Sequence, residues 1–197
     1  MKVTIHQPEH FPYMGFFQKI QSADLYVVLD NVKFRKNYFQ NRNKFINKSG
    51  DEEWFTVPVN KKANSMLIKD VKVLNNLIWR KKIINKLKQN LNVDLTRIYD
   101  AESLLEINVA SIKWCMERLS INTPMVLASK LKATGKKSEL LANIVSEVGG
   151  TEYVSGPSGK DYLDYDYFND INISFFEPNV ENYYSMLYNI SKGVKNV

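Results

Sequence analysis

A histidine, a glutamine and a proline follow one another where the first strand of this chain is expected to end. The β-branched run Val3-Thr4-Ile5 predicts a strand, and His6-Gln7-Pro8 interrupts it. Imidazole has a pKa near neutrality and can accept, donate or transfer a proton, while the amide of Gln7 supplies a donor and an acceptor. We therefore predict that His6 is a catalytic base and that Gln7 contacts substrate. An ordinary strand-end histidine, satisfied by the backbone, is the competing interpretation.

A second candidate segment follows the next expected strand. The continuous apolar run 25–29 predicts a strand buried on both faces, and it ends at Asp30. A carboxylate in this position is expected to orient or support His6. Residues 31–43 then mix cations and amides with aromatic rings, a composition typical of nucleotide and nucleic-acid binding. We predict that Lys36 and Arg42 hold a diphosphate and that Asn41 contacts sugar hydroxyls or phosphate; a solvated loop is the alternative.

A third candidate is a glycine- and serine-rich turn after the short expected strand at 153–154. Backbone N–H groups of such a turn, with a helix behind them, favour an anion, and Lys160 adds charge. The predicted binding residues here are Ser155, Gly156, Ser158 and Lys160. Gly15, within the first expected helix, allows close approach of a ligand. The turn lacks the spacing of a Walker A loop, and a simple structural turn is the alternative.

Composition and charge limit the classes of protein that fit. The 197 residues are 44% hydrophobic and 24% charged, which is typical of a globular protein with a sizeable core. Residues 33–88 hold 15 Lys and Arg against four acids, whereas residues 139–181 hold nine acids and one lysine. This asymmetry suggests an anionic partner for the basic segment. No run is long and apolar enough to predict a transmembrane helix, and no secretory signal is evident.

Cysteine and histidine usage points to a protein without a disulfide or a structural metal. The single cysteine, Cys115, is expected to pack in the middle of a helix, which favours a cytoplasmic location. Only His6 and His10 could add nitrogen ligands, so we expect no structural metal.

The elements that must position these residues alternate between strands and helices. We expect strands at 3–5, 25–29, 125–127, 153–154 and 171–176, helices at 13–22, 76–91, 103–119 and 138–148, and a hairpin from 44–46 and 53–59. Residues 69–74 are expected to form a further strand. The predicted fold is α/β and Rossmann-like, a mostly parallel sheet flanked by helices, with a β-hairpin and helical insertion. No domain boundary is evident, so residues 1–197 are predicted to form a single domain.

These segments together resemble the WbqC-like family over residues 1 to about 176. The resemblance rests on His6-Gln7-Pro8, Pro12, the stretches 15–20, 23–24 and 29–34, Asn41-Arg42-Asn43, 54–59, and Tyr153-Val154-Ser155-Gly156 through Tyr162-Leu163. The family usually has Gln at the position of Lys33, and residues 183–191 match its C-terminal segment poorly. The resemblance implies a bacterial protein of surface-polysaccharide (O-antigen, lipopolysaccharide) biosynthesis. It further implies a transferase that adds glycine or another acyl group to the amino group of a nucleotide sugar, a dTDP- or UDP-linked amino sugar.

The donor and the enzymatic class stay open at this point. ATP activation of a carboxylate or an aminoacyl-tRNA could each supply the acyl group, and tRNA binding would use the basic segment. One alternative is a non-catalytic module that binds sugar nucleotides or nucleic acid. Another is a nucleotidyltransferase or ATP-dependent ligase similar to pantothenate synthetase, although the position after Gly15 is Phe16 rather than a second histidine.

Overall fold

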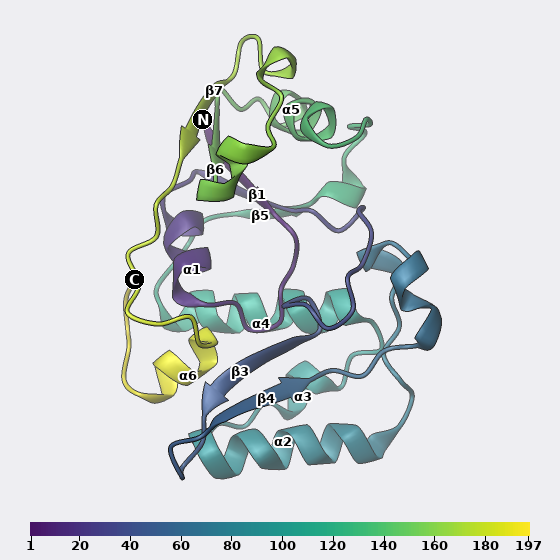
Figure 1. Cartoon of the computed structure of the whole chain (residues 1–197), viewed down its shortest axis with the longest axis vertical. Helices are drawn as coiled ribbons and strands as arrows, with labels where there is room; N and C mark the ends of the chain where they lie inside the picture. Colours follow the sequence, from purple (N-terminus) through teal and green to yellow (C-terminus); the bar gives the residue numbers. More distant parts are fainter. The chain divides into compact units, whose positions relative to one another are not determined.

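The computed structural model describes residues 1–197 as two compact units between which the chain passes repeatedly (Figure 1). Unit 1 comprises Met1–Gln7, Gly15–Asp30 and Asn122–Val180. Unit 2 comprises Pro8–Met14, Asn31–Ile121 and Glu181–Val197.

Unit 1 is built on a five-stranded sheet in which every pair of neighbours is parallel. Its strands run in the order β5-β2-β1-β6-β7. They are β1 (Lys2–His6), β2 (Leu25–Val28), β5 (Met125–Leu127), β6 (Glu152–Ser155) and β7 (Asn172–Phe175), with helices α1 (Met14–Gln21) and α5 (Ser138–Glu147). This arrangement confirms the predicted α/β fold with a parallel sheet flanked by helices.

The strand order places a topological switch between β1 and β6. Helix α1 connects β1 to β2 in one direction across the sheet, and α5 returns from β5 to β6 in the other (Figure 1). Right-handed connections therefore place the two helices on opposite faces, which explains why β1, β2 and β6 are buried almost throughout. In doubly wound sheets of this type, ligands bind outside the carboxyl ends of the strands at the switch point.

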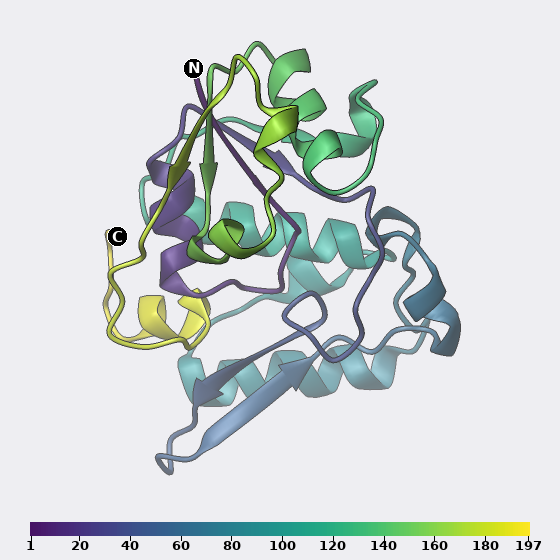
Figure 2. The ribbon, with the colours of Figure 1, turned by 45° about the horizontal axis from the view of Figure 1, so that its top comes forward.

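Unit 2 combines an antiparallel hairpin with four α-helices and two short 3₁₀ helices, Lys61–Ser65 and Ile68–Asp70 (Figure 2). The hairpin consists of β3 (Arg42–Ile46) and β4 (Glu52–Thr56), and the helices are α2 (Leu77–Leu91), α3 (Thr96–Tyr99), α4 (Leu104–Arg118) and α6 (Met186–Ser191). Asn76 caps α2 by accepting from the N–H of Ile78, and Ser103 begins α4 with a capping box completed by Glu106. The hairpin and both long helices were predicted from the sequence.

Two local predictions are wrong. Residues 69–74 do not form a strand: Ile68–Asp70 is a short 3₁₀ helix, followed by isolated bridges at Lys72 and Val73. The turn after β6 does not lead into an α-helix, because Pro157–Asp161 forms only a short 3₁₀ helix. The backbone dipole at that turn is correspondingly weaker than the sequence suggested.

None of the helices is both long and apolar enough to cross a membrane. Cys115 is fully buried in α4, and burial raises the pKa of its thiol well above the usual value, in agreement with a packing role.

Candidate functional site

His6 ends β1, on the carboxyl side of the sheet in unit 1. Its Nδ1 lies 2.9 Å from the carbonyl oxygen of Gln7 and donates a proton to it, so Nε2 carries the free lone pair of the neutral ring. The ring packs edge-on against Phe16 of α1, with centroids 4.9 Å apart. One hydrogen bond and one aromatic contact thus fix both the tautomer and the orientation of the imidazole.

Burial dominates the titration of His6. It lowers the pKa of the imidazole from 6.5 to about 3; the positive charge of Lys19 acts in the same direction, and the bond to the Gln7 carbonyl opposes both. His6 is therefore neutral at physiological pH, with its Nε2 available to accept a hydrogen bond.

Lys19 also belongs to this site, although it was not among the residues predicted from the sequence. Lys19 is buried in α1, on the side of the helix that also buries Phe16 and Ile20. A lysine on the apolar face of an amphipathic helix is the signal that could have revealed it, because lysines are rarely buried without a reason.

Replacing Lys19 is expected to raise the pKa of His6. In Lys19→Met the nearby positive charge is lost while burial persists, so the pKa should move up from about 3 but stay below 6.5. Titration of the His6 ring protons by NMR measures this shift directly. An unchanged His6 titration would show that Lys19 does not act on the imidazole; Lys2→Met, which removes an exposed lysine of the same unit, is the matched control.

Asp30 follows β2 and is fully buried, but its carboxylate is bound elsewhere than to His6. Oδ1 accepts from the backbone N–H of Ser129 at 2.8 Å, and Oδ2 accepts from the Ser129 hydroxyl at 2.6 Å. Asp30 therefore ties the end of β2 to the segment after β5. The hydrogen bond that orients the His6 ring is the one to the Gln7 carbonyl oxygen. Support of His6 by Asp30 stays a prediction.

The turn after β6 lies across the switch point from β1, since Thr4 pairs with Val154 in the parallel register. Ser155 is buried, and its Oγ packs against Gly159. This hydroxyl is within electrostatic reach of the phenols of Tyr153 and Tyr162 but makes no hydrogen bond of standard geometry. Gly156 precedes the short 3₁₀ helix. Ser155 and Gly156 thus stand at the strand end where ligands collect in this fold class.

Other predicted residues of unit 1 are placed differently. Gly15 is buried at the start of α1. Ser158 is exposed, as is Lys160, which pairs with Glu177 at 2.8 Å and lies 5.4 Å from the ring of Phe175. Glu177 raises the pKa of Lys160 and already balances its charge, which weakens the case for an anion at this lysine.

Lys36, Asn41 and Arg42 belong to unit 2. Asn41 is buried, with Oδ1 accepting from the N–H of Asn37 and Nδ2 donating to the carbonyl of Val57. Its amide therefore holds the loop to the hairpin rather than facing solvent. Lys36 is exposed, and Arg42 stacks on Trp54, with its guanidinium carbon 4.3 Å from the ring.

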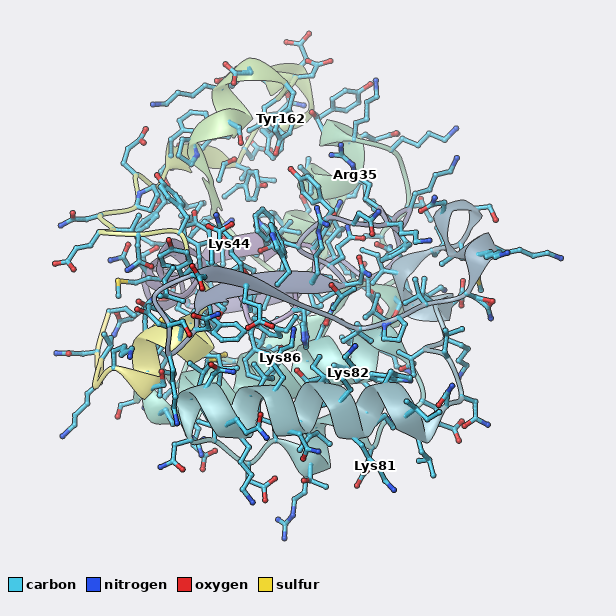
Figure 3. All side chains as sticks on the ribbon, turned by 60° about the horizontal axis from the view of Figure 1, so that its bottom comes forward. Arg35, Lys44, Lys81, Lys82, Lys86 and Tyr162 are labelled. Atoms are coloured by element: carbon cyan, nitrogen blue, oxygen red, sulfur yellow. The ribbon has the colours of Figure 1, made fainter.

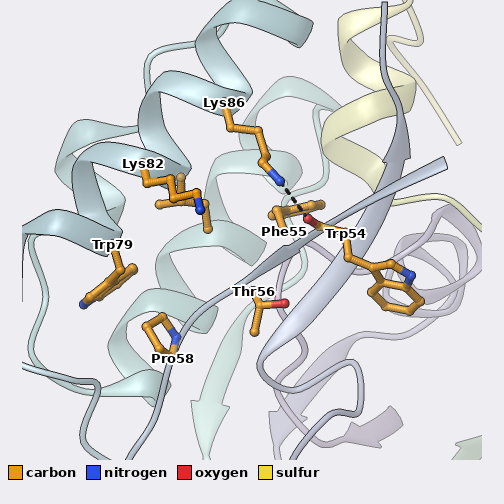
Figure 4. Close-up of a pocket in the computed structure, with 8 residues that line it drawn as sticks. Trp54, Phe55, Thr56, Pro58, Trp79, Lys82 and Lys86 are labelled. Carbon is orange, nitrogen blue, oxygen red and sulfur yellow. Dashed lines mark hydrogen bonds between the residues drawn. The ribbon is translucent and has the colours of Figure 1, made fainter. Parts of the chain in front are cut away.

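Unit 2 also contains a pocket of about 260 Å³ between β4 and α2 (Figure 4). Trp79 and Pro58 lie on one side of it, and Lys82 points toward its centre. Lys86 bonds to Glu53 at 2.5 Å and to the backbone carbonyl of Trp54 at 3.2 Å. Lys86 thus connects α2 to strand β4 of the hairpin.

No group of three or more His, Cys, Asp or Glu side chains is arranged to hold a metal ion. The polar groups available for a ligand are instead the neutral imidazole and strand-end backbone of unit 1, and the cations of unit 2.

Comparison with known proteins assigns most of the chain to one family. The profile of the WbqC-like protein family matches residues 7–190, a span that includes segments of both units. The chain is 28% identical over 184 residues to "Uncharacterized protein Rv1507c" of Mycobacterium tuberculosis, an alignment covering 87% of this chain and 79% of that protein. No solved structure matches the chain significantly. With a match over most of its length, the chain belongs to the WbqC-like protein family.

Proposed function

We propose that this protein transfers glycine or another acyl group to the amino group of a dTDP- or UDP-linked amino sugar. Such products serve surface-polysaccharide biosynthesis, including O-antigen synthesis, and we place the reaction in the cytoplasm. The observation that carries the proposal is the environment of His6: a half-buried, neutral imidazole with a free Nε2, next to a buried lysine, at the carboxyl edge of a doubly wound sheet.

The same environment suits an amine nucleophile. A sugar amine is protonated in water at neutral pH and cannot attack a carbonyl in that form. Burial and the charge of Lys19 lower the pKa of His6, and they would lower the pKa of an ammonium bound beside it for the same reasons. The site therefore favours the unprotonated, reactive amine.

The chemistry balances with His6 as a proton relay. The amine nitrogen forms a bond to the acyl carbon, and the bond from that carbon to the leaving oxygen breaks. Nε2 takes the proton that the nitrogen loses and passes it to the leaving oxygen. Because the surroundings disfavour imidazolium, the proton is held only briefly. The leaving group is the ribose oxygen of an aminoacyl-tRNA or the phosphate of an acyl adenylate.

Mass spectrometry of dTDP- and UDP-amino sugars incubated with the protein, glycine, ATP and charged tRNA tests the proposal. Omitting each component in turn identifies the donor. His6→Ala should lower turnover by about 10²-fold or more, because general base catalysis contributes about that much. A control change at the exposed Asn143, Asn143→Gln, should leave turnover unchanged.

The outcome separates this reaction from its rivals. Wild-type turnover by His6→Ala would remove His6 from the reaction. Tight binding of the sugar nucleotide without any product would favour a non-catalytic binding module. Magnesium-dependent release of pyrophosphate that requires neither glycine nor the amino sugar would favour nucleotidyl transfer.

A further inference from the structure

A continuous strip of aromatic rings and cations crosses unit 2, and we call it the stacked strip. Its members come from the loop after Asn31, from the hairpin and from the segment before α6: Arg35, Tyr38, Phe39, Arg42, Lys44, Trp54 and Tyr184. Figure 3 labels Arg35 and Lys44, which stand near the two ends of this chain of contacts. Contacts link them in the order Arg35, Tyr38, Phe39, Trp54, Lys44 and Tyr184, and Arg42 joins this series at Trp54.

The strip combines contacts between cations and rings with contacts between rings. The guanidinium carbon of Arg35 lies 4.3 Å from the centre of the Tyr38 ring. Phe39 stacks on Trp54 with centroids 6.4 Å apart and planes inclined by 29°. The guanidinium carbon of Arg42 lies 4.3 Å from the centre of the Trp54 ring.

The rings remain accessible despite these contacts. The exposed fractions of Tyr38 and Trp54 are 44% and 37%. Cross-strand pairing of Lys44 with Trp54 and of Arg42 with Thr56 puts these side chains on one face of the hairpin. The opposite face buries Phe45 and Phe55. The strip is therefore an outward surface on a packed support.

The guanidinium groups of the strip differ from others stacked on rings in the same unit. Arg80 stacks on Trp79 but donates to the carbonyl of Ala101. Arg118 stacks on Trp114, donates to the Trp114 carbonyl and pairs with Glu117.

Arg35 and Arg42 have a ring partner but no acceptor for their guanidinium N–H groups, and the Nε of Arg42 is buried without a hydrogen bond. Stacking thus holds two guanidiniums in place and leaves donors for a ligand.

Buried amides fix the loop that carries Arg35 and Tyr38. The Oε1 of Gln40 accepts from the N–H of Arg35 at 2.8 Å, and the Oδ1 of Asn41 accepts from the N–H of Asn37 at 3.0 Å. Asn41 therefore acts on this surface as a positioning residue. The cost of ordering the loop is met in the folded protein, before any ligand arrives.

The geometry points to the stacked strip as a binding site for single-stranded nucleic acid. Bases stack on the exposed rings and guanidinium planes, and phosphates accept from the free guanidinium N–H groups. The surplus of cations over acids between residues 33 and 88 supplies the long-range attraction. A paired duplex hides its base faces, so it cannot use the rings. This inference does not depend on the transfer reaction; an RNA-borne acyl donor would be one use for the strip.

Fluorescence anisotropy with a labelled RNA of about ten nucleotides tests the inference across a salt series. The full chain should bind the single strand more tightly than a duplex of the same length. Trp54→Ala should weaken binding about tenfold at constant salt dependence, because it removes a stacking surface but no charge. Arg42→Gln should reduce the slope of log K against log salt by about 0.7, the value for one phosphate contact on a single strand.

Arg118→Gln is the matched control, since it removes the same charge from another tryptophan-stacked arginine of unit 2. Its affinity and salt slope should stay close to those of the wild type, and near-ultraviolet circular dichroism should show that all variants are folded. Equal losses in Arg118→Gln and Arg42→Gln, or unchanged binding in Trp54→Ala, would overturn the proposal. Equally tight binding of duplex, or displacement of RNA by polyglutamate at equal charge, would do the same.

Discussion

Lowering the pH from 7 to 4.5 is expected to reduce the free energy of unfolding by about 4 kcal/mol through two histidines. The pKa of His6 and that of His10 are each lowered from 6.5 to about 3, mainly by burial. Between those values the unfolded chain binds more protons than the folded protein. The contribution is therefore fully present above pH 6.5 and is lost as the pH falls toward 3.

Urea unfolding at several pH values, followed by far-ultraviolet circular dichroism, measures this loss. Each histidine adds at most about 1.4 kcal/mol per pH unit to the slope, and the total is discounted because His6 is only half-buried. In His10→Gln the slope between pH 6.5 and 4.5 should fall by about half, whatever the stability at pH 7. A slope that is the same in wild type and variant would show that His10 does not titrate on unfolding.

Asn108→Leu is expected to cost about 4 kcal/mol of stability, because Asn108 is the centre of a buried polar network in unit 2. Its Nδ2 donates to the carbonyls of Pro8 and Gln40, at 3.0 and 2.7 Å. Its Oδ1 and the Nδ1 of His10 are both buried without a hydrogen bond of standard geometry, and Asn108 raises the pKa of His10 against the larger effect of burial. Leucine would remove the donor from both carbonyls in a buried site.

Chemical denaturation at pH 7.5 measures this effect, with Asn143→Leu as the matched control. Asn143 is also a helical asparagine, but it is exposed and makes one hydrogen bond to Thr134, so its replacement should cost less than about 1 kcal/mol. Equal stability losses in the two variants would contradict the role given to the network.

The rest of the network explains why Asn108 matters beyond its own bonds. The hydroxyl of Tyr99 bonds to Nε2 of His10 at 3.1 Å, and the N–H of Phe11 donates to Ser111. Phe11 has a φ of 45°, in the left-handed region that non-glycine residues rarely adopt. The segment Pro8–Met14 is thus held in an unusual conformation by side chains of α3 and α4.

Much of the fold could be predicted because its local signals agree with the tertiary structure. The apolar run 25–29 becomes β2, and the helix expected at 138–148 becomes α5, which Gly149 follows with a φ of 73°. The prediction of a strand at 69–74 was wrong because Val71 and Val73 are buried, as in a strand, yet no neighbouring segment forms a continuous ladder of hydrogen bonds with them. Side-chain pattern reports burial, and it does not report whether a backbone partner exists.

The candidate site could be predicted only in part, for a related reason. His6 stands out by its type and its place at a strand end, and the structure puts it at the switch point. The sequence could not show that Asp30 is bound to Ser129, 99 residues away, or that Asn41 faces inward. The sequence pattern of polar residues in a loop is the same whether they contact a ligand or support the backbone.

The division of the chain has a consequence for how the protein is made. Unit 2 includes both Pro8–Met14 and Glu181–Val197. These two segments are in contact: the N–H of Met186 donates to the carbonyl of Pro12 at 2.7 Å, and Tyr13 forms an isolated β-bridge with Ser185. A nascent chain therefore cannot finish this unit until residue 186 has left the ribosome. Until then the backbone groups of Pro12 and Tyr13 lack these partners, which a segment far later in the chain supplies.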